Sequence, residues 1–186
     1  MSTPRIIGGS AKGIRLQDVP GDTTRPITDR VKESLFNIIG PDILDIDMLD
    51  LFGGTGSVGI EALSRGARFV RFLDNAHAAV QVIKTNLAST HLAQKAEVQF
   101  ADAFSVLRRP ADRTFDIVYV APPQYKDMWL QALQALQENP SWLAEQAWVI
   151  VQIHPIEFNE QTFDHFKEFD RRKYGSTLLL FYEYVP

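Results

Sequence analysis

The chain has 186 residues, of which 45% are apolar and 23% are charged, and it contains no cysteine. This composition is typical of one folded domain and argues against disorder and fibrous repeats. The absence of cysteine excludes disulfides, thiolate nucleophiles and cysteine-ligated zinc. We find neither an apolar run of membrane-spanning length nor a signal-peptide pattern. We therefore expect a cytoplasmic protein with a single domain over residues 1–186.

The net charge of −4 is unevenly distributed along the chain. Residues 1–32 carry a net charge of +3, so the remainder carries −7. Such asymmetry is typical of a phosphate-binding arm on an acidic body, although an ordinary solvated surface would also show it. The charged residues of this segment are Arg5, Lys12, Arg15, Arg25, Arg30 and Lys32 against Asp18, Asp22 and Asp29.

The N-terminal part predicts a hairpin, a loop and a helix, in that order. Residues 5–7 and 14–16 flank a glycine-containing turn, and a Pro- and Thr-rich loop follows. Thr28 is placed to cap a helix that Gly40 and Pro41 end. We expect residues 1–27 to form a basic hairpin and loop, and residues 28–186 to form the core of the domain.

Beyond residue 47, short apolar runs alternate with amphipathic stretches. The runs cover residues 48–52, 69–73, 98–100, 115–120 and 148–153, and the helical stretches cover 57–64, 76–89, 104–107 and 128–137. Residues 166–174 and 177–185 are predicted to form an antiparallel pair joined at Gly175. The pattern predicts an α/β, Rossmann-like fold: a mostly parallel seven-stranded sheet with an antiparallel C-terminal edge and helices on both faces. Its ligand site should lie beyond the carboxyl ends of the strands.

A glycine motif, Gly54-x-Gly56-x-x-Gly59, stands where the first strand is expected to turn into a helix. Glycines there allow a tight turn and a close backbone approach, and the start of the helix offers free N–H groups. Asp74 follows at the end of the second predicted strand, placed to accept hydrogen bonds from a ribose. Together these features favour a nucleoside ligand over a plain structural turn.

Acidic residues near the loop favour S-adenosylmethionine over NAD. Asp50 would repel a pyrophosphate but suits the cationic amino group of a methionyl end. Asp102 fits an adenine edge, although it is equally well placed to cap the next short helix. The candidate cofactor residues are Asp50, Phe52, Gly53, Gly54, Thr55, Gly56, Asp74, Asn75, Asp102 and Ala103.

The fourth predicted strand runs into Ala121, Pro122, Pro123, Gln124 and Tyr125. Two consecutive prolines hold the backbone extended and remove two N–H donors. The carbonyl groups then stay free to accept a hydrogen bond from an incoming amine. A simple strand terminator is the alternative.

Four segments resemble the bacterial 16S ribosomal RNA guanine-N2 methyltransferase family. They are residues 5–9 (RIIGG), 25–37 (RPITDRVKESLFN), 49–56 (LDLFGGTG) and 59–66 (GIEALSRG). The resemblance runs from the hairpin through the fourth strand and is weak after Trp129. It implies a class I methyltransferase fold, S-adenosylmethionine as the methyl donor, and a guanine of small-subunit ribosomal RNA, free or in a subunit precursor, as the acceptor.

Ala121 departs from the family pattern, which has Asp-Pro-Pro followed by Phe or Tyr. In that pattern the carboxylate and a backbone carbonyl orient the target amine, and the aromatic ring stacks on the extruded base. Ala121 offers no such acceptor; Gln124 is one candidate replacement, and Tyr125 is a candidate for stacking. The resemblance assigns the catalytic role to residues 121–125.

The basic N-terminal part would hold the RNA through Arg5, Lys12, Arg15, Arg25, Thr28 and Arg30. The four histidines show no metal-ligand spacing, so we expect no metal. Three alternatives stay open: an impaired protein that binds S-adenosylmethionine and docks on ribosomal RNA, a nicotinamide-dependent oxidoreductase, and a methyltransferase for DNA, another RNA or a protein amine.

Overall fold

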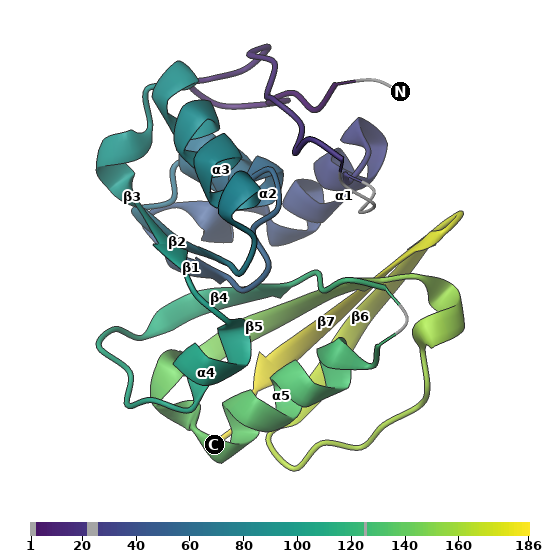
Figure 1. Cartoon of the computed structure of the whole chain (residues 1–186). Helices are drawn as coiled ribbons and strands as arrows, with labels where there is room; N and C mark the ends of the chain where they lie inside the picture. The colour runs from purple at the N-terminus through teal and green to yellow at the C-terminus, as the bar shows by residue number, and fades with distance from the viewer. Residues whose placement is uncertain (1–2, 22–25, 125) are drawn as a thin grey trace.

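The computed structural model describes residues 3–21, 26–124 and 126–186, which include a seven-stranded sheet in the order β3-β2-β1-β4-β5-β7-β6 (Figure 1). The strands are β1 (Asp47–Asp50), β2 (Phe69–Asp74), β3 (Ala96–Phe100), β4 (Phe115–Val120), β5 (Leu143–Ile153), β6 (Phe166–Tyr174) and β7 (Thr177–Tyr184). The α-helices are α1 (Asp29–Ile39), α2 (Ser57–Ser64), α3 (His77–Ser89), α4 (Ala103–Leu107) and α5 (Met128–Glu138), and 3₁₀ turns include η1 (Gly40–Ile43) and η4 (Pro155–Glu157). The predicted mixed α/β sheet is confirmed.

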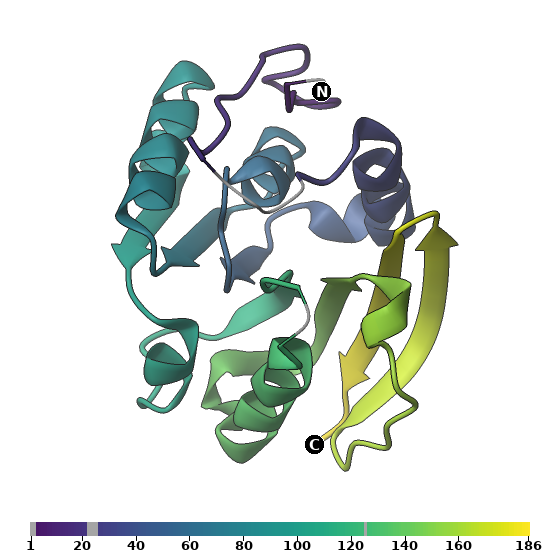
Figure 2. The ribbon, with the colours of Figure 1, turned by 45° about the vertical axis from the view of Figure 1, so that its right-hand side comes forward.

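Strands β1 to β5 are parallel, because each crosses over to the next through a segment that packs on a face of the sheet. Helices α1, α2 and α3 cover one face, and α4 and α5 cover the other (Figures 1 and 2). Each face has its own apolar core: Leu35, Ile60 and Phe72 lie in the first, and Leu49, Val118 and Trp129 lie in the second. Within the described part of the chain, no helix is long and apolar enough to cross a membrane.

The C-terminal edge is antiparallel, with β7 between β5 and β6. Gly175 supplies the positive φ of 55° that the tight β6–β7 turn needs. Strand β5 is longer than predicted, because residues 143–147 extend it toward its N-terminus. Leu143 pairs with Phe115 and the register then shifts, with Gln146 at φ 61°, so the alternation breaks and the apolar pattern reveals only the second half of the strand.

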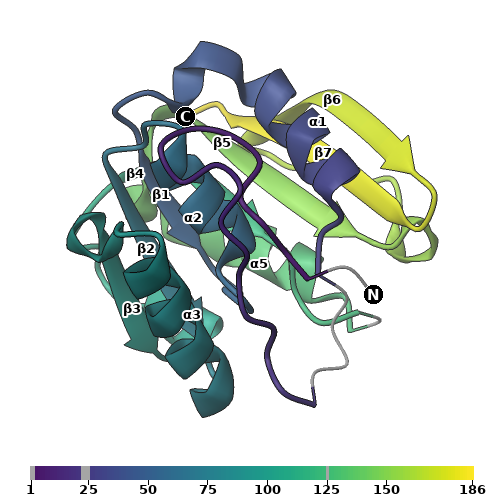
Figure 3. The same cartoon turned by 90° about the horizontal axis from the view of Figure 1, so that it is seen from above.

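The predicted N-terminal hairpin exists as a turn closed by a single β-bridge, Arg5 to Arg15. The backbone bonds Ile6 N to Ile14 O (2.9 Å) and Leu16 N to Pro4 O (2.7 Å) hold its two sides together. Ile6 and Leu16 are buried in the first core, so this arm packs across the helix layer that contains α2 (Figure 3). We use "the arm" for residues 3–21.

Candidate functional site

The glycine loop between β1 and α2 follows the predicted geometry. Strand β1 ends at Asp50, two residues before the predicted end at Phe52, because the chain turns there. The last bond to β4 is donated by Leu51 N to Tyr119 O (3.1 Å). Gly54 and Gly56 have positive φ angles of 58° and 80°. A Cβ on Gly53 would lie 2.7 Å from Ile83 Cδ1 and 3.3 Å from Leu73 O, so a side chain there would have to displace its neighbours. The loop presents its backbone toward the carboxyl edge of the sheet.

Asp74 joins the end of β2 to this loop. Its Oδ2 accepts a hydrogen bond from Gly54 N (2.9 Å), and its Oδ1 accepts one from Ala76 N (2.8 Å). Each carboxylate oxygen has further acceptor capacity. Because the side chain is half-buried, a ligand hydroxyl can approach the same carboxylate that fixes the loop.

Asp50 is buried at the end of β1, with 1% of its surface exposed. Its Oδ1 has no hydrogen-bond partner within the described residues. Burial raises the pKa of Asp50 from 3.8 to about 7, although a hydrogen bond from the Phe52 backbone opposes the shift; the Asp74 carboxylate adds a smaller upward effect. A buried carboxylate oxygen without a partner is unfavourable. The site is therefore suited to a cationic group that would pair with Asp50.

Asp102 is the N-cap of α4, which was the alternative role predicted for it from the sequence. Its Oδ2 accepts from both Ser105 N (2.8 Å) and Ser105 Oγ (3.0 Å). Phe52 and Phe104 meet edge to face, with ring centroids 6.1 Å apart, and they bring the glycine loop and α4 together. Asn75 is exposed and Ala103 is buried. The capping bond does not exclude an additional contact through the other carboxylate oxygen.

The segment after β4 lies at the same edge of the sheet as the glycine loop. Ala121 and Pro122 are half-buried, Pro123 and Gln124 are exposed, and Tyr125 lies outside the described residues. Next to this segment is a contact that was not predicted from the sequence: the buried Tyr119 donates its hydroxyl to Gln152 Oε1 on β5. No spacing rule connects two residues on separate strands, so the sequence carried no signal for it.

A buried ion pair connects the arm, α1 and α2. Lys32 and Glu61 are almost fully buried, with Nζ 3.2 Å from Oε1. Glu61 also accepts from Ile7 N and Gly8 N, both at 2.9 Å, and Lys32 donates to Ser57 Oγ (2.9 Å), directly after the glycine loop. The arm is therefore bonded to the helix that begins at the candidate cofactor loop.

Asn86 on α3 makes a second such connection. Its Nδ2 donates to Thr55 O (2.8 Å), and its Oδ1 accepts from Gln17 N (2.8 Å). Neither connection was predicted from the sequence, because a polar residue on a helix is ordinarily solvated.

The basic residues of the N-terminal part fall into different environments. Lys12, Arg15 and Arg30 are exposed, whereas Arg5 Nε pairs with Asp29 Oδ2 at 2.7 Å. Lys32, counted in the basic charge of this segment, is buried and is not available to a phosphate. Thr28 caps α1 by accepting from Val31 N (3.3 Å), as predicted. Arg25 lies outside the described residues.

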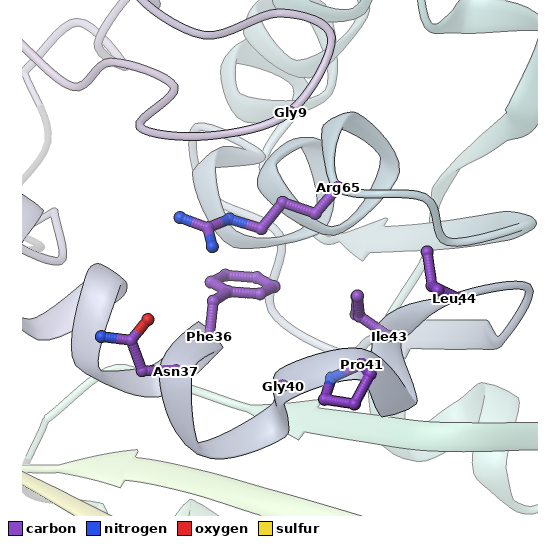
Figure 4. A pocket seen from close by; sticks show the side chains of 8 residues that line it. All are labelled: Gly9, Phe36, Asn37, Gly40, Pro41, Ile43, Leu44 and Arg65. Carbon is purple, nitrogen blue, oxygen red and sulfur yellow. The ribbon is translucent and has the colours of Figure 1, made fainter.

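Two surface cavities lie around these elements. One of about 420 Å³ lies between the arm, the end of α1 and the residue after α2, and there the Arg65 guanidinium lies 5.1 Å over the Phe36 ring (Figure 4). This cavity is lined by η1, which comes just before the amino end of β1, whereas the glycine loop follows the carboxyl end of β1. The cavity and the loop therefore lie at opposite ends of the parallel strands. A second cavity of about 720 Å³ lies between α4 and α5 and borders Asp102.

Known structures and sequences agree with this architecture. A solved structure described as "Putative methyltransferase yhhF from Escherichia coli" superposes with a TM-score of 0.86 at 33% identity, and the match covers 99% of each chain. The fold and the loop at the carboxyl edge define a Rossmann-like methyltransferase architecture.

The family follows from two sequence comparisons. Residues 4–183 match the family described as Conserved hypothetical protein 95, so the chain belongs to that family. YlbH from Bacillus subtilis is 42% identical over 150 residues, which cover 80% of this chain and 81% of that protein. Ribosomal RNA small subunit methyltransferase D of Escherichia coli strain K12 is 39% identical over 150 residues, covering 80% of this chain and 73% of that protein.

Proposed function

We propose that this protein is an S-adenosylmethionine-dependent methyltransferase that modifies the exocyclic amine N2 of a guanine in small-subunit ribosomal RNA. The observation that carries the donor is Asp50, a buried carboxylate without a partner for Oδ1, beside a glycine loop fixed by Asp74. The names of relatives at 39% identity support the RNA class of the acceptor. The guanine N2 position is our inference from the resemblance in the N-terminal segments.

The described residues fit the donor by chemistry. Asp50 would pair with its amino group, and Asp74 would accept from the ribose hydroxyls. Phe52, Asn75, Asp102 and Ala103 would surround the adenine, and residues 53–56 would contact the donor through their backbone. When bound, S-adenosylmethionine supplies a methyl group already activated by a sulfonium, so the protein's main contribution is to position the acceptor.

The acceptor side is the edge formed by residues 121–125. Backbone carbonyls of the Pro122–Pro123 segment would accept an N–H of the target amine and turn its lone pair toward the methyl group, with Tyr125 stacking on the extruded base. Arg5, Lys12, Arg15, Arg25, Thr28 and Arg30 would hold the RNA backbone. In this scheme, residues 28–186 form the core that carries the chemistry, and the basic hairpin and loop of residues 1–27 contact the RNA together with Thr28 and Arg30. The substrate would be free RNA or a subunit precursor in the cytoplasm, and neither a membrane nor a metal would take part.

Transfer of labelled methyl from S-adenosylmethionine to ribosomal subunits from a strain lacking the gene tests the proposal. We expect one labelled guanine, identified as N2-methylguanosine by nucleoside mass spectrometry. Asp74→Ala should abolish calorimetric binding of S-adenosylhomocysteine. Binding of NAD that is insensitive to Asp74→Ala, with no heat from S-adenosylhomocysteine, would contradict the proposal, and label at another base or amine would correct the acceptor.

Ala121 supports one second candidate, a protein that binds the donor and docks on ribosomal RNA but is nearly inert. Losing a preorganised polar contact costs roughly 10²–10³ in rate. On that reading the parent binds S-adenosylmethionine but labels neither naked RNA nor immature or mature subunits. Ala121→Asp should then raise turnover by one or more orders of magnitude.

A further inference from the structure

The end of β4 lacks a side-chain acceptor, but the neighbouring strand provides a polar group beside it. The parallel register pairs Tyr119 with Ile150 and Val120 with Val151. The next position along places Gln152 on β5 beside Ala121, at the edge where the target amine would enter. Gln152 is half-buried, so the residue is partly accessible.

Gln152 and Ala121 lie on the same face of the sheet. Tyr119 lies in the first core, and Ala121, two residues further along β4, packs against the same core. Because the Tyr119 hydroxyl donates to Gln152 Oε1, the Gln152 side chain points to this face as well, which is the face covered by α1. In the parallel pair of β1 and β4, Asp50 stands opposite Tyr119. The Asp50 carboxylate, whose Oδ1 has no partner among the described residues, the Tyr119 phenol and the Gln152 amide therefore follow one another across three neighbouring strands.

The Tyr119 hydroxyl holds the Gln152 amide in place and leaves one acceptor position of Gln152 Oε1 available. Tyr119 has 3% of its surface exposed, and burial, together with the Asp50 carboxylate, raises its phenol pKa well above the ordinary value, so it remains a donor. A carbonyl oxygen accepts two hydrogen bonds. Tyr119 occupies one position of Oε1, and the other can accept an N–H.

We propose that Gln152 is the side chain that accepts the N–H of the target amine, in place of the acceptor that Ala121 lacks, and that Tyr119 is the residue that positions its amide. This inference rests on the proposed function and deepens it. The Gln152 Nε2 group can donate to an unprotonated ring nitrogen next to the amine. The acceptor class is therefore an exocyclic amine flanked by such a nitrogen, which N2 and N3 of guanine provide.

The transfer step balances without any further reactant. The lone pair of the amine nitrogen forms the N–C bond, and the C–S bond breaks with its electron pair moving to sulfur. The nitrogen then carries the positive charge until one N–H proton leaves to water. Gln152 Oε1 holds the other N–H through a hydrogen bond and does not take a proton, because an amide oxygen is too weakly basic.

The test compares Gln152→Leu, Tyr119→Phe and the double variant in single-turnover methylation of ribosomal subunits. Gln152→Leu should lower the rate about 10²-fold, within the range for one preorganised polar contact, and leave S-adenosylhomocysteine affinity within twofold. Tyr119→Phe should lower the rate about tenfold in the parent and have no effect in the Gln152→Leu background. A merely structural role for Tyr119 would give the same loss in both backgrounds.

Matched controls and a conservative variant complete the experiment. Gln99→Leu changes a half-buried strand glutamine on β3, and Tyr182→Phe changes a buried tyrosine on β7; both should keep the parental rate. Gln152→Glu retains an acceptor oxygen, so its single-turnover methylation rate should be at least tenfold higher than that of Gln152→Leu. A Gln152→Leu rate within twofold of an active parent overturns this inference alone. A parent that methylates no form of the subunit overturns the proposed function, and this inference with it.

Discussion

Asp50 should destabilise the free protein above neutral pH, although it is central to the proposed donor site. Burial raises its pKa from 3.8 to about 7, so the folded state retains a proton that the unfolded state releases. The raised pKa means that the free energy of unfolding falls as pH rises from about 4 to about 7. At 1.36 kcal/mol per pH unit the full penalty is about 4 kcal/mol. Between about pH 4.5 and about pH 8 it changes by about 3 kcal/mol.

Asp50→Asn removes this titration. We expect the difference in free energy of unfolding between variant and parent to shift by about 3 kcal/mol in favour of the variant from about pH 4.5 to about pH 8. Urea denaturation at both pH values measures it, and any constant cost of burying the Asn amide cancels in the comparison. A pH-independent difference between the two proteins would mean that Asp50 has no raised pKa in the folded state.

Asp47, at the other end of β1, provides a control of opposite sign. Burial raises its pKa, but hydrogen bonds from Arg68 and Arg113 outweigh that effect and lower it overall. A lowered pKa stabilises the folded state above the unfolded value, and this contribution is lost as pH falls. Asp47→Asn should therefore lose stability relative to the parent at neutral pH and recover it in acid.

Binding of the donor should also release a proton. A cationic amino group beside Asp50 would return the pKa of that carboxyl toward its ordinary value. Calorimetry at pH 7 in two buffers of different ionisation enthalpy should show this release for S-adenosylhomocysteine. It should show none for 5′-methylthioadenosine, which has no amino-acid end. Equal release with both ligands would place the amino group elsewhere.

Three further predictions concern the arm and α2. Glu61→Ala leaves Lys32 buried without its carboxylate partner and should lower the free energy of unfolding in urea by about 3–5 kcal/mol. Adding Lys32→Met should recover part of this stability, whereas an exposed pair would show neither effect. Replacing the exposed Lys12 and Arg15 by Ser should weaken RNA binding and flatten its salt dependence by about 0.7–0.9 log units per lost phosphate contact, with donor affinity unchanged, and equal slopes would place the RNA elsewhere. Gly59→Ala puts a Cβ 2.3 Å from an aromatic ring of β2 and should lower stability by about 1–3 kcal/mol in the same assay, whereas an unchanged midpoint would mean that the ring has room to move.

Local chemistry explains why much of the fold and the candidate site was predictable. The glycine loop, the Thr28 cap and the Gly175 turn depend on residues within a few positions of one another, and the structure has each where expected. The distribution of polar residues between surface and core was less predictable. Lys32 belongs to a segment with net positive charge, yet it is buried against Glu61, because α2 and the arm cover it from distant parts of the chain.

The alternation of strands and helices, the position of the candidate cofactor loop and the tight turns could be predicted from the residues alone, because periodicity and glycine geometry act over short distances. The neighbours of each polar side chain depend on how the strands and helices pack together. Tyr119 and Gln152 are 33 positions apart and meet because β4 and β5 pair in one register. Strand pairing and helix packing bring such residues together through contacts between distant segments, and those contacts leave no repeating pattern in the sequence.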